Sequence, residues 1–148
     1  MFKKMLSTKA PASVIYVRLF LALVFVSEGI QKFLFPDALG VGRFIKIGVP
    51  APEFIAPFVG VVEIAGGLLI LFGILTRFAS ITLVIDMIVA ISTTKIPILF
   101  KDGIWTMLHE SRVDFSMFLG CIFLLIVGAG KFSLDYFLSK PGKNIQTS

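Results

Sequence analysis

The sequence predicts an all-α integral membrane protein, a four-helix bundle with short interfacial helices in its connections. Hydrophobic residues make up 57% of the 148 residues and charged residues only 16%, against about 25% in an average soluble domain. The mean hydropathy is +0.97. Four apolar runs each approach the roughly 20 residues that cross a bilayer as a helix. A soluble helical core is excluded because no run shows a wide polar face.

The first predicted span covers about residues 12–35 and follows a basic start, Met1 to Ala10. The run is too long for the apolar region of a signal peptide, and no small-residue cleavage site precedes its polar end. We therefore expect an uncleaved span. It contains Arg18, Glu28 and Lys32, which share one stripe of a helix that turns by about 100° per residue. Glu28 before Lys32 is the favourable order for a helical i,i+4 ion pair.

Proline and glycine punctuate residues 36–53, which predicts a short helix or a re-entrant segment at the membrane surface around Phe44. We expect Asp37 to cap this short helix, because a carboxylate can accept hydrogen bonds from the first free N–H groups of a helix.

The second predicted span, about residues 54–75, is the most informative stretch. Glu63 is the one charged residue between Phe58 and Thr76. A carboxylate near the centre of a span costs about 2.5 kcal/mol or more and indicates a functional site. Glycines such as Gly60 and Gly67 let neighbouring helices approach closely. We expect them to line a packed interior face that holds the polar group.

A tight turn is predicted at Thr76-Arg77, with Arg77 just past the end of the second span, where a cation meets the negative end of the helix dipole. The third span then covers about residues 78–96, with Asp86 near its middle, and we expect Pro97 to end it.

Residues 98–113 form an amphipathic connection in which Trp105 is expected to anchor at the membrane interface. The fourth predicted span covers about residues 115–132. A polar tail, residues 136–148, follows it. The short connections leave no room for an added soluble domain, so we expect residues 1–148 to form a single membrane domain.

The distribution of Lys and Arg outside the spans predicts the orientation. Seven lie on the side of the termini: Lys3, Lys4, Lys9, Arg77, Lys131, Lys140 and Lys143. Five lie on the opposite side: Arg43, Lys46, Lys95, Lys101 and Arg112. Because positive residues favour the cytoplasmic side, both termini are expected in the cytoplasm.

The depths of the polar residues suggest how they meet. With a rise of about 1.5 Å per residue, Glu28 lies roughly 10 Å and Glu63 roughly 13 Å below the outer surface. This predicts an outer group of Glu28, Lys32 and Glu63, and an inner pair of Arg18 with Asp86. Three acids then face two bases, so one carboxyl group is expected to stay protonated. Such a network suits proton-coupled chemistry, but it equally suits a structural role as polar contacts between helices.

Other kinds of site are not indicated. His109 is the one histidine and has no metal-ligand spacing, so no metal site is expected. Cys121 is the one cysteine, lies in an apolar run, and allows no intrachain disulfide or CxxC motif. No phosphate-binding loop is visible. The net charge of +5 resides mostly at span edges, where it meets lipid head groups, so no nucleic-acid partner is expected.

Four blocks of residues, in order along the chain, resemble the DoxX family of small four-helix membrane proteins. They are Arg18-Leu19 with Phe25, Glu28-Gly29 and Lys32-Phe33; Gly48 to Pro52; Gly60, Glu63, Gly66-Gly67, Leu69, Gly73 and Thr76-Arg77; and Gly128 to Asp135. The last block is similar to a G-x-G-x-x-S-x-D signature. Asp114 takes the place of a glutamate that the family often carries at the start of the fourth span, and Asp86 matches no family motif.

The resemblance implies a bundle in a prokaryotic cytoplasmic membrane. Some family members resemble the membrane subunit of thiosulfate:quinone oxidoreductase, and others are associated with oxidative-stress or thiol-redox complexes. The family's fold transfers to this chain more readily than any one reaction does.

Three functions remain open. The first is a quinone-associated redox subunit in which Glu28 and Glu63 exchange protons with the quinone and Lys32 or Arg18 polarises its carbonyls; any enzyme activity would belong to a complex with another membrane or peripheral redox subunit. The second is a non-catalytic scaffold that docks a partner through residues 36–53 and 98–113. The third, less favoured, is a small transporter, since no inverted repeat of broken helices is visible. Whether the chain forms a homo-oligomer is also left open.

Overall fold

The computed structural model describes residues 10–139, which form helices joined by short connections, with no strand among them. Four helices are long: α2 (Val14–Leu34), α4 (Pro52–Phe72), α5 (Thr76–Asp102) and α7 (Arg112–Val127). Three are short: α3 (Val41–Lys46), α6 (Ile104–Glu110) and α8 (Leu134–Ser139). The predicted all-α fold is confirmed.

Within the described range, three helices are long and apolar enough to cross a membrane: α2, α4 and α5. The predicted fourth span corresponds to α7, which has 16 residues and rises by about 24 Å, less than the roughly 30 Å of a hydrocarbon core. The prediction placed its end at residue 132. The helix ends earlier because Gly128 and Gly130 have positive φ angles of 85° and 81°, which other residues rarely adopt.

The turn between α4 and α5 lies earlier than the sequence suggested. Gly73 and Leu75 both adopt left-handed backbone conformations, with φ of 66° and 46°, and Thr76 already begins α5. Arg77 therefore does not follow the end of α4. It lies in the first turn of α5, and its guanidinium donates a hydrogen bond of 3.0 Å to the carbonyl of Ile126, near the C-terminal end of α7.

Two further local predictions were wrong. Pro97 lies inside α5, which continues to Asp102 and ends at Gly103 (φ 85°). A proline removes one backbone donor, and the long helix continues past that loss. The short helix expected in residues 36–53 is present as α3, but its N-cap is Gly40, with no side-chain cap, so Asp37 does not cap it.

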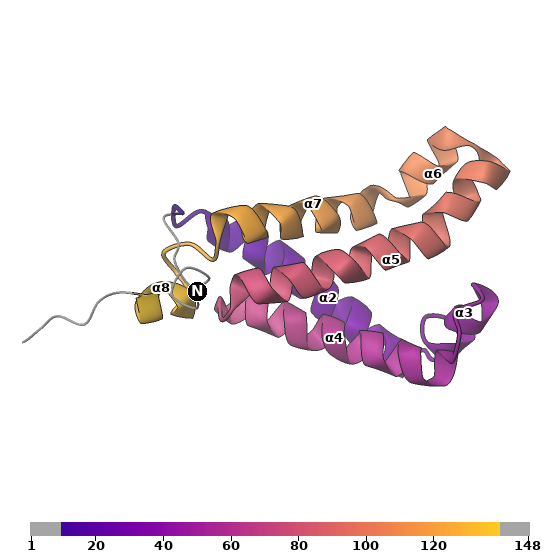
Figure 1. The fold of residues 1–148 in the computed structure, drawn as a ribbon, viewed down its shortest axis with the longest axis horizontal. Helices are drawn as coiled ribbons and strands as arrows, with labels where there is room; N and C mark the ends of the chain where they lie inside the picture. Colours follow the sequence, from indigo (N-terminus) through magenta and orange to yellow (C-terminus); the bar gives the residue numbers. More distant parts are fainter. Residues whose placement is uncertain (1–9, 140–148) are drawn as a thin grey trace, which may run out of the picture.

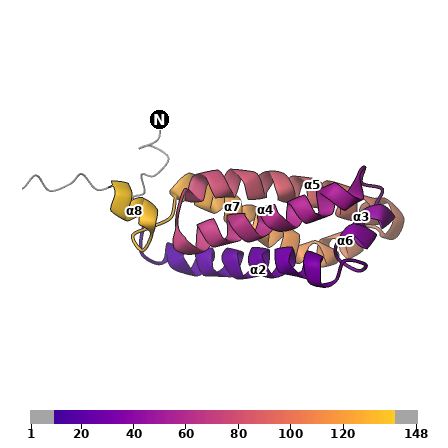
Figure 2. The ribbon, with the colours of Figure 1, turned by 90° about the horizontal axis from the view of Figure 1, so that it is seen from below.

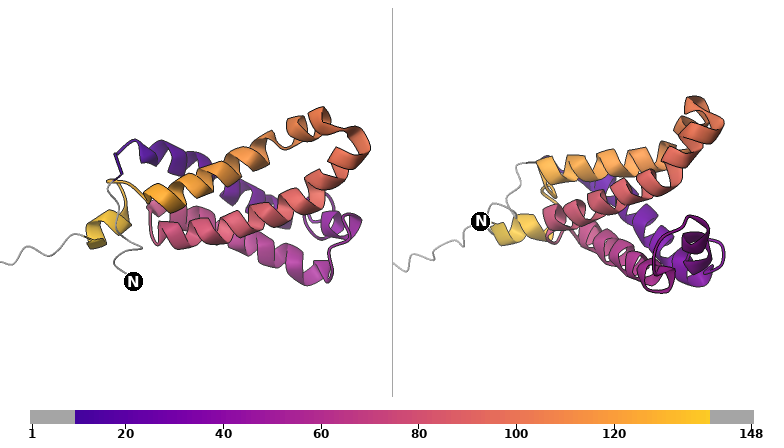
Figure 3. Two further views of the ribbon diagram at one scale, coloured as in Figure 1. Left: turned by 45° about the horizontal axis from the view of Figure 1, so that its top comes forward. Right: turned by 45° about the vertical axis from the view of Figure 1, so that its right-hand side comes forward.

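The long helices are arranged as two closely packed pairs, α2 with α4 and α5 with α7 (Figure 2). The pairs lie together at the end that carries α8 and diverge toward the end that carries α3 and α6 (Figures 1 and 3). Glycine makes the first pair close: a Cβ added at Gly29 would lie 2.7 Å from the carbonyl oxygen of Gly60.

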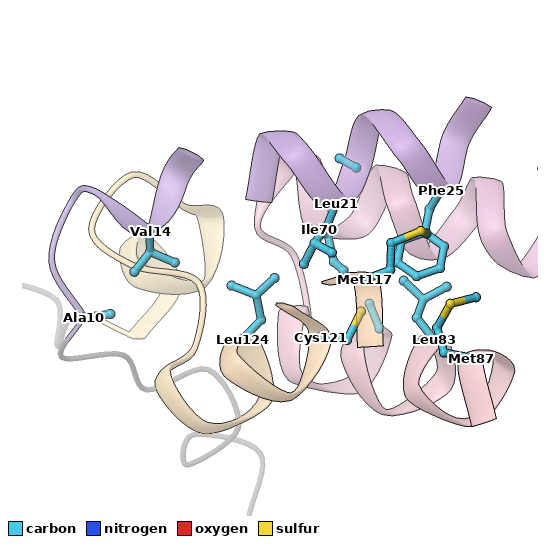
Figure 4. Close-up of a cluster of buried hydrophobic side chains, with 12 residues drawn as sticks. Ala10, Val14, Leu21, Phe25, Ile70, Leu83, Met87, Met117, Cys121 and Leu124 are labelled. Atoms are coloured by element: carbon cyan, nitrogen blue, oxygen red, sulfur yellow. The ribbon is translucent and has the colours of Figure 1, made fainter. Parts of the chain in front are cut away.

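The apolar core fills the half of the bundle nearer α8. Fully buried side chains from all four long helices meet there: Leu21, Phe25, Ile70, Leu83, Cys121 and Leu124 (Figure 4). Cys121 is thus a buried small side chain. The predicted polar tail is helical at its start, because residues 136–139 belong to α8. Its remainder, like the basic start at Met1, lies outside the described residues.

Candidate functional site

A cavity of about 320 Å³ lies at the diverging end of the bundle, between the two helix pairs and beside α3. Apolar side chains such as Phe44, Val59 and Met117 form much of its wall. Its ionisable and hydroxyl-bearing residues come from α2, α3, α4, α5 and α7: Glu28, Lys32, Arg43, Glu63, Asp86, Thr93, Thr94, Lys95 and Asp114. Apolar walls with a few converging polar groups are typical of a ligand site.

An ion pair joins α2 to α4 inside this cavity. Nζ of Lys32 donates to Oε2 of Glu63 at 2.5 Å, and the two side chains are 12% and 5% exposed. The sequence had favoured Glu28 as the helical partner of Lys32. Glu63 takes this place, and it is the buried carboxylate of the two, for which a missing cation would cost more. Glu28 still lines the cavity, within electrostatic range of Glu63.

Asp86 belongs to the same cluster. It lies on α5, beside the carboxyl group of Glu63 and within electrostatic range of Lys32. Its Oδ2 atom is buried and has no hydrogen-bond partner. A buried polar oxygen without a partner is rare, and it is satisfied when a ligand or water donates to it.

Arg18 does not pair with Asp86, contrary to the prediction from depth. Arg18 lies at the other end of the bundle, 2% exposed. Its guanidinium donates to the carbonyls of Ile70 at 2.8 Å, Leu71 at 2.5 Å and Ala129 at 3.2 Å, and also to that of Phe132. Arg18 therefore satisfies carbonyl groups at the end of α4 and in the segment after α7, a structural role.

Asp135 completes this arrangement, which we call the Arg18–Asp135 clasp. Its carboxylate accepts hydrogen bonds from the backbone N–H groups of Leu75 at 2.8 Å and Thr76 at 2.9 Å, so it caps α5. It also lies within electrostatic range of Arg18. Gly73 is required beside it, because an added Cβ would lie 2.5 Å from the Cβ of Ser133. The G-x-G-x-x-S-x-D block thus closes one end of the bundle.

The two glycines expected to line the site lie elsewhere. Added Cβ atoms at Gly60 and Gly67 would meet Phe33 and Val26, respectively, both on α2, at 2.7 and 2.8 Å. Neither glycine lines the cavity. They allow α2 and α4 to pack closely, and this packing brings Lys32 within reach of Glu63.

Sequence reasoning missed the mouth of the cavity. Lys95 forms an ion pair with Asp114 at 3.2 Å and donates to the carbonyl of Glu110 at 2.9 Å, which ties α5 to α6 and α7. Arg43 lines the cavity from α3, and Thr93 from α5. The one signal available was the resemblance that matched Asp114 to a family glutamate at the start of the fourth span. The residues described contain no cluster of potential metal ligands, and His109 is not among the cavity's lining residues.

Fold and site together define a helical integral membrane protein with an apolar-walled cavity between two helix pairs, into which several ionisable side chains converge. Comparison with known proteins gives the family: the family model DoxX matches residues 13–96, and the chain belongs to the DoxX family. The match covers the first three long helices except the last turns of α5, and it includes Lys32, Glu63 and Asp86.

Two relatives are informative. The chain is 52% identical over 143 residues to "Uncharacterized membrane protein Rv3486" of Mycobacterium tuberculosis, covering 93% of this chain and 88% of the relative. It is 28% identical over 128 residues to "Putative oxidoreductase CatD" of Bacillus subtilis, covering 86% and 88%. No solved structure matches the chain significantly.

Proposed function

We propose that this protein is a quinone-binding membrane subunit of an oxidoreductase complex, and that the cavity holds the quinone head group. The observation that carries the proposal is that a largely buried Lys32–Glu63 ion pair and the unpartnered Oδ2 of Asp86 occur together in one apolar-walled cavity. The name given to CatD adds an oxidoreductase association in a related protein.

The residues fit the two needs of a quinone head group. Each carbonyl oxygen accepts hydrogen bonds, and Lys32 donates one N–H to Glu63 and has two more available. Reduction to the quinol adds two electrons and two protons, forming an O–H bond at each former carbonyl. Glu63, Asp86 and Glu28 are carboxyl groups within the cavity that can pass protons to those oxygens. Arg18 has no part in this, because its donors are used in the clasp.

The electrons come from a partner. The chain's one cysteine, Cys121, is buried in the apolar core and does not line the cavity. We therefore assign electron delivery to a second, redox-active protein subunit, and the binding and protonation of the quinone to this chain. We place the protein in a prokaryotic cytoplasmic membrane with both termini in the cytoplasm.

Binding of a short-tailed quinone analogue to the purified protein tests the proposal. Glu63→Gln is expected to weaken binding by tenfold or more, since a hydrogen bond involving a charged group contributes about 1.5–3 kcal/mol. Arg77→Gln is the matched control, because Arg77 lies at the opposite end of the bundle. Equal affinity of the wild type and Glu63→Gln, or no binding at all, would contradict the proposal.

A scaffold role predicts a different pattern. If the polar cluster only fixes the packing of the helices, Glu63→Gln lowers the amount of folded protein, and the activity of the complex falls in the same proportion. Under the quinone proposal, activity per folded molecule falls while the complex still assembles. Co-purification of the partner with the variant, quantified beside activity, separates the two functions.

A further inference from the structure

The residues that line the cavity are unevenly distributed along the bundle, and this asymmetry bears on where protons enter. Along the four long helices, the lining residues cluster toward the end that carries α3 and α6. On α5 they begin at Asp86, ten residues after the helix starts. On α7 they end at Met117, five residues after its start. Glu63, Asp86 and Met117 thus mark the floor of the cavity.

Below this floor the bundle is filled. Leu83 and Cys121 lie one helical turn further toward α8, and Leu21, Ile70 and Leu124 lie beyond them, all fully buried. Figure 4 shows these side chains meeting between the helices. The Arg18–Asp135 clasp lies beyond the core. In it, Arg18 donates to carbonyl groups at the end of α4, and Asp135 accepts from N–H groups at the start of α5.

Above the floor, polar side chains occur among the apolar residues of the wall as far as the mouth. Thr93 and Thr94 line the cavity two turns above Asp86, and Lys95 and Asp114 follow at the rim. Arg43 lines it from α3. These groups can hydrogen-bond to water, whereas the apolar core cannot, and this difference favours proton access to Asp86 from the rim.

We propose that Glu63 and Asp86 exchange protons with one side of the membrane only, the side of α3 and α6, so that the protein's quinone chemistry is vectorial. This inference rests on the proposed function for the identity of the reacting group. When a quinone is reduced by two electrons from the partner subunit, both protons are drawn from the α3–α6 side. When a quinol is oxidised, both are released there.

Side-specific labelling of introduced cysteines tests this directly. Asp86→Cys places a thiol at the floor, and Thr93→Cys places one on the wall with little change of shape. Lys46→Cys on α3 and Leu138→Cys on α8 are exposed reference positions at the two ends. A membrane-impermeant, positively charged thiol reagent is added to sealed vesicles of known orientation, and adducts are located by mass spectrometry. The buried native Cys121 stays unlabelled unless the variant unfolds.

We expect Asp86→Cys and Thr93→Cys to be labelled when the reagent is on the side from which Lys46→Cys is labelled. Neither should be labelled when the reagent is on the side from which Leu138→Cys is labelled. Labelling of Asp86→Cys from the α8 side, or from both sides, would overturn the inference. The inference would also be overturned if the thiol of Thr93→Cys reacts but the thiol of Asp86→Cys, in folded protein, reacts from neither side.

The same variants separate this inference from the proposed function. A quinone analogue bound in the cavity is expected to protect Thr93→Cys from the reagent. If labelling is one-sided but no quinone analogue protects, the sidedness holds and the quinone assignment fails. If the analogue protects but labelling occurs from both sides, the quinone assignment holds and the sidedness fails.

Discussion

Breaking the Lys32–Glu63 ion pair, one residue at a time and then both together, distinguishes a structural contact from a binding site. Lys32→Met leaves the Glu63 carboxylate, 4% exposed, without its cation, and removing one partner of a buried pair costs about 3–5 kcal/mol. Glu63→Met costs less, about 1–3 kcal/mol, because the Lys32 ammonium can extend toward the cavity mouth.

The double variant Lys32→Met/Glu63→Met is expected to recover most of this loss, because replacing a whole buried pair with apolar side chains of similar size is close to neutral. The coupling free energy between the two sites should therefore reach about 3 kcal/mol or more. It is measured as the difference in free energy of unfolding by a denaturing detergent among the wild type, the single variants and the double variant.

Ligand binding should behave differently from stability in this cycle. Each of the three variants loses Lys32, Glu63 or both, the groups to which we assign the binding of the quinone head group. All three should therefore bind a quinone analogue at least tenfold more weakly, as expected for a lost charged hydrogen bond of about 1.5–3 kcal/mol. Strictly additive effects on unfolding would refute the ion pair. A double variant that regains both stability and full quinone affinity would refute its role in binding.

Three further predictions concern residues that hold the helices together around the cavity. Arg18→Met should abolish accumulation of folded protein in the membrane, because it removes four hydrogen bonds from a charged donor to carbonyl groups, each contributing about 1.5–3 kcal/mol; normal yield and melting behaviour would contradict the clasp. Gly29→Val should destabilise the protein by about 1–3 kcal/mol, since its Cβ meets the backbone of α4, whereas Ser27→Ala on the exposed face of α2 should have no effect in the same thermal assay. Asp114→Asn should change stability by less than about 1 kcal/mol, because its ion pair with Lys95 is partly exposed; a larger loss on unfolding would show that the rim is structural.

Much of the fold could be read from the sequence because membrane spans follow simple rules of length and polarity. Apolar runs bounded by polar connections located α2, α4 and α5. Helix ends were less certain, since they depend on backbone conformation. Gly128 ends α7 early and Leu75 adopts a left-handed conformation, whereas Pro97 does not end α5.

The site was partly predictable for a similar reason. Depth along a helix is set by sequence position, so Glu28, Lys32 and Glu63 were placed in one outer group, and the structure brings Nζ of Lys32 to 2.5 Å from Oε2 of Glu63. Depth does not say which face a side chain occupies or what it bonds to. Arg18 was assigned to Asp86, whereas backbone carbonyls left free at the end of α4 and after α7 are its actual partners.

Contacts across the bundle's mouth could not be derived from the chain alone. The ion pair of Lys95 with Asp114 depends on how α6 folds back between α5 and α7. Gly60 and Gly67 were correctly identified as residues at a close helix contact, but the contact is with α2 and lies outside the cavity. Predicting which residues lie near a ligand therefore requires the arrangement of all four long helices.

Photolabelling with a quinone analogue that carries a reactive group on its ring tests the central claim most directly. After irradiation in native membrane and digestion, adducts are located by mass spectrometry. The cavity predicts adducts on residues of its wall, such as Val59, Ala90 and Met117, and their loss when an unreactive quinone competes. Adducts confined to the lipid-facing groove of α2 and α4, lined by Leu23 and Leu68, would contradict the account.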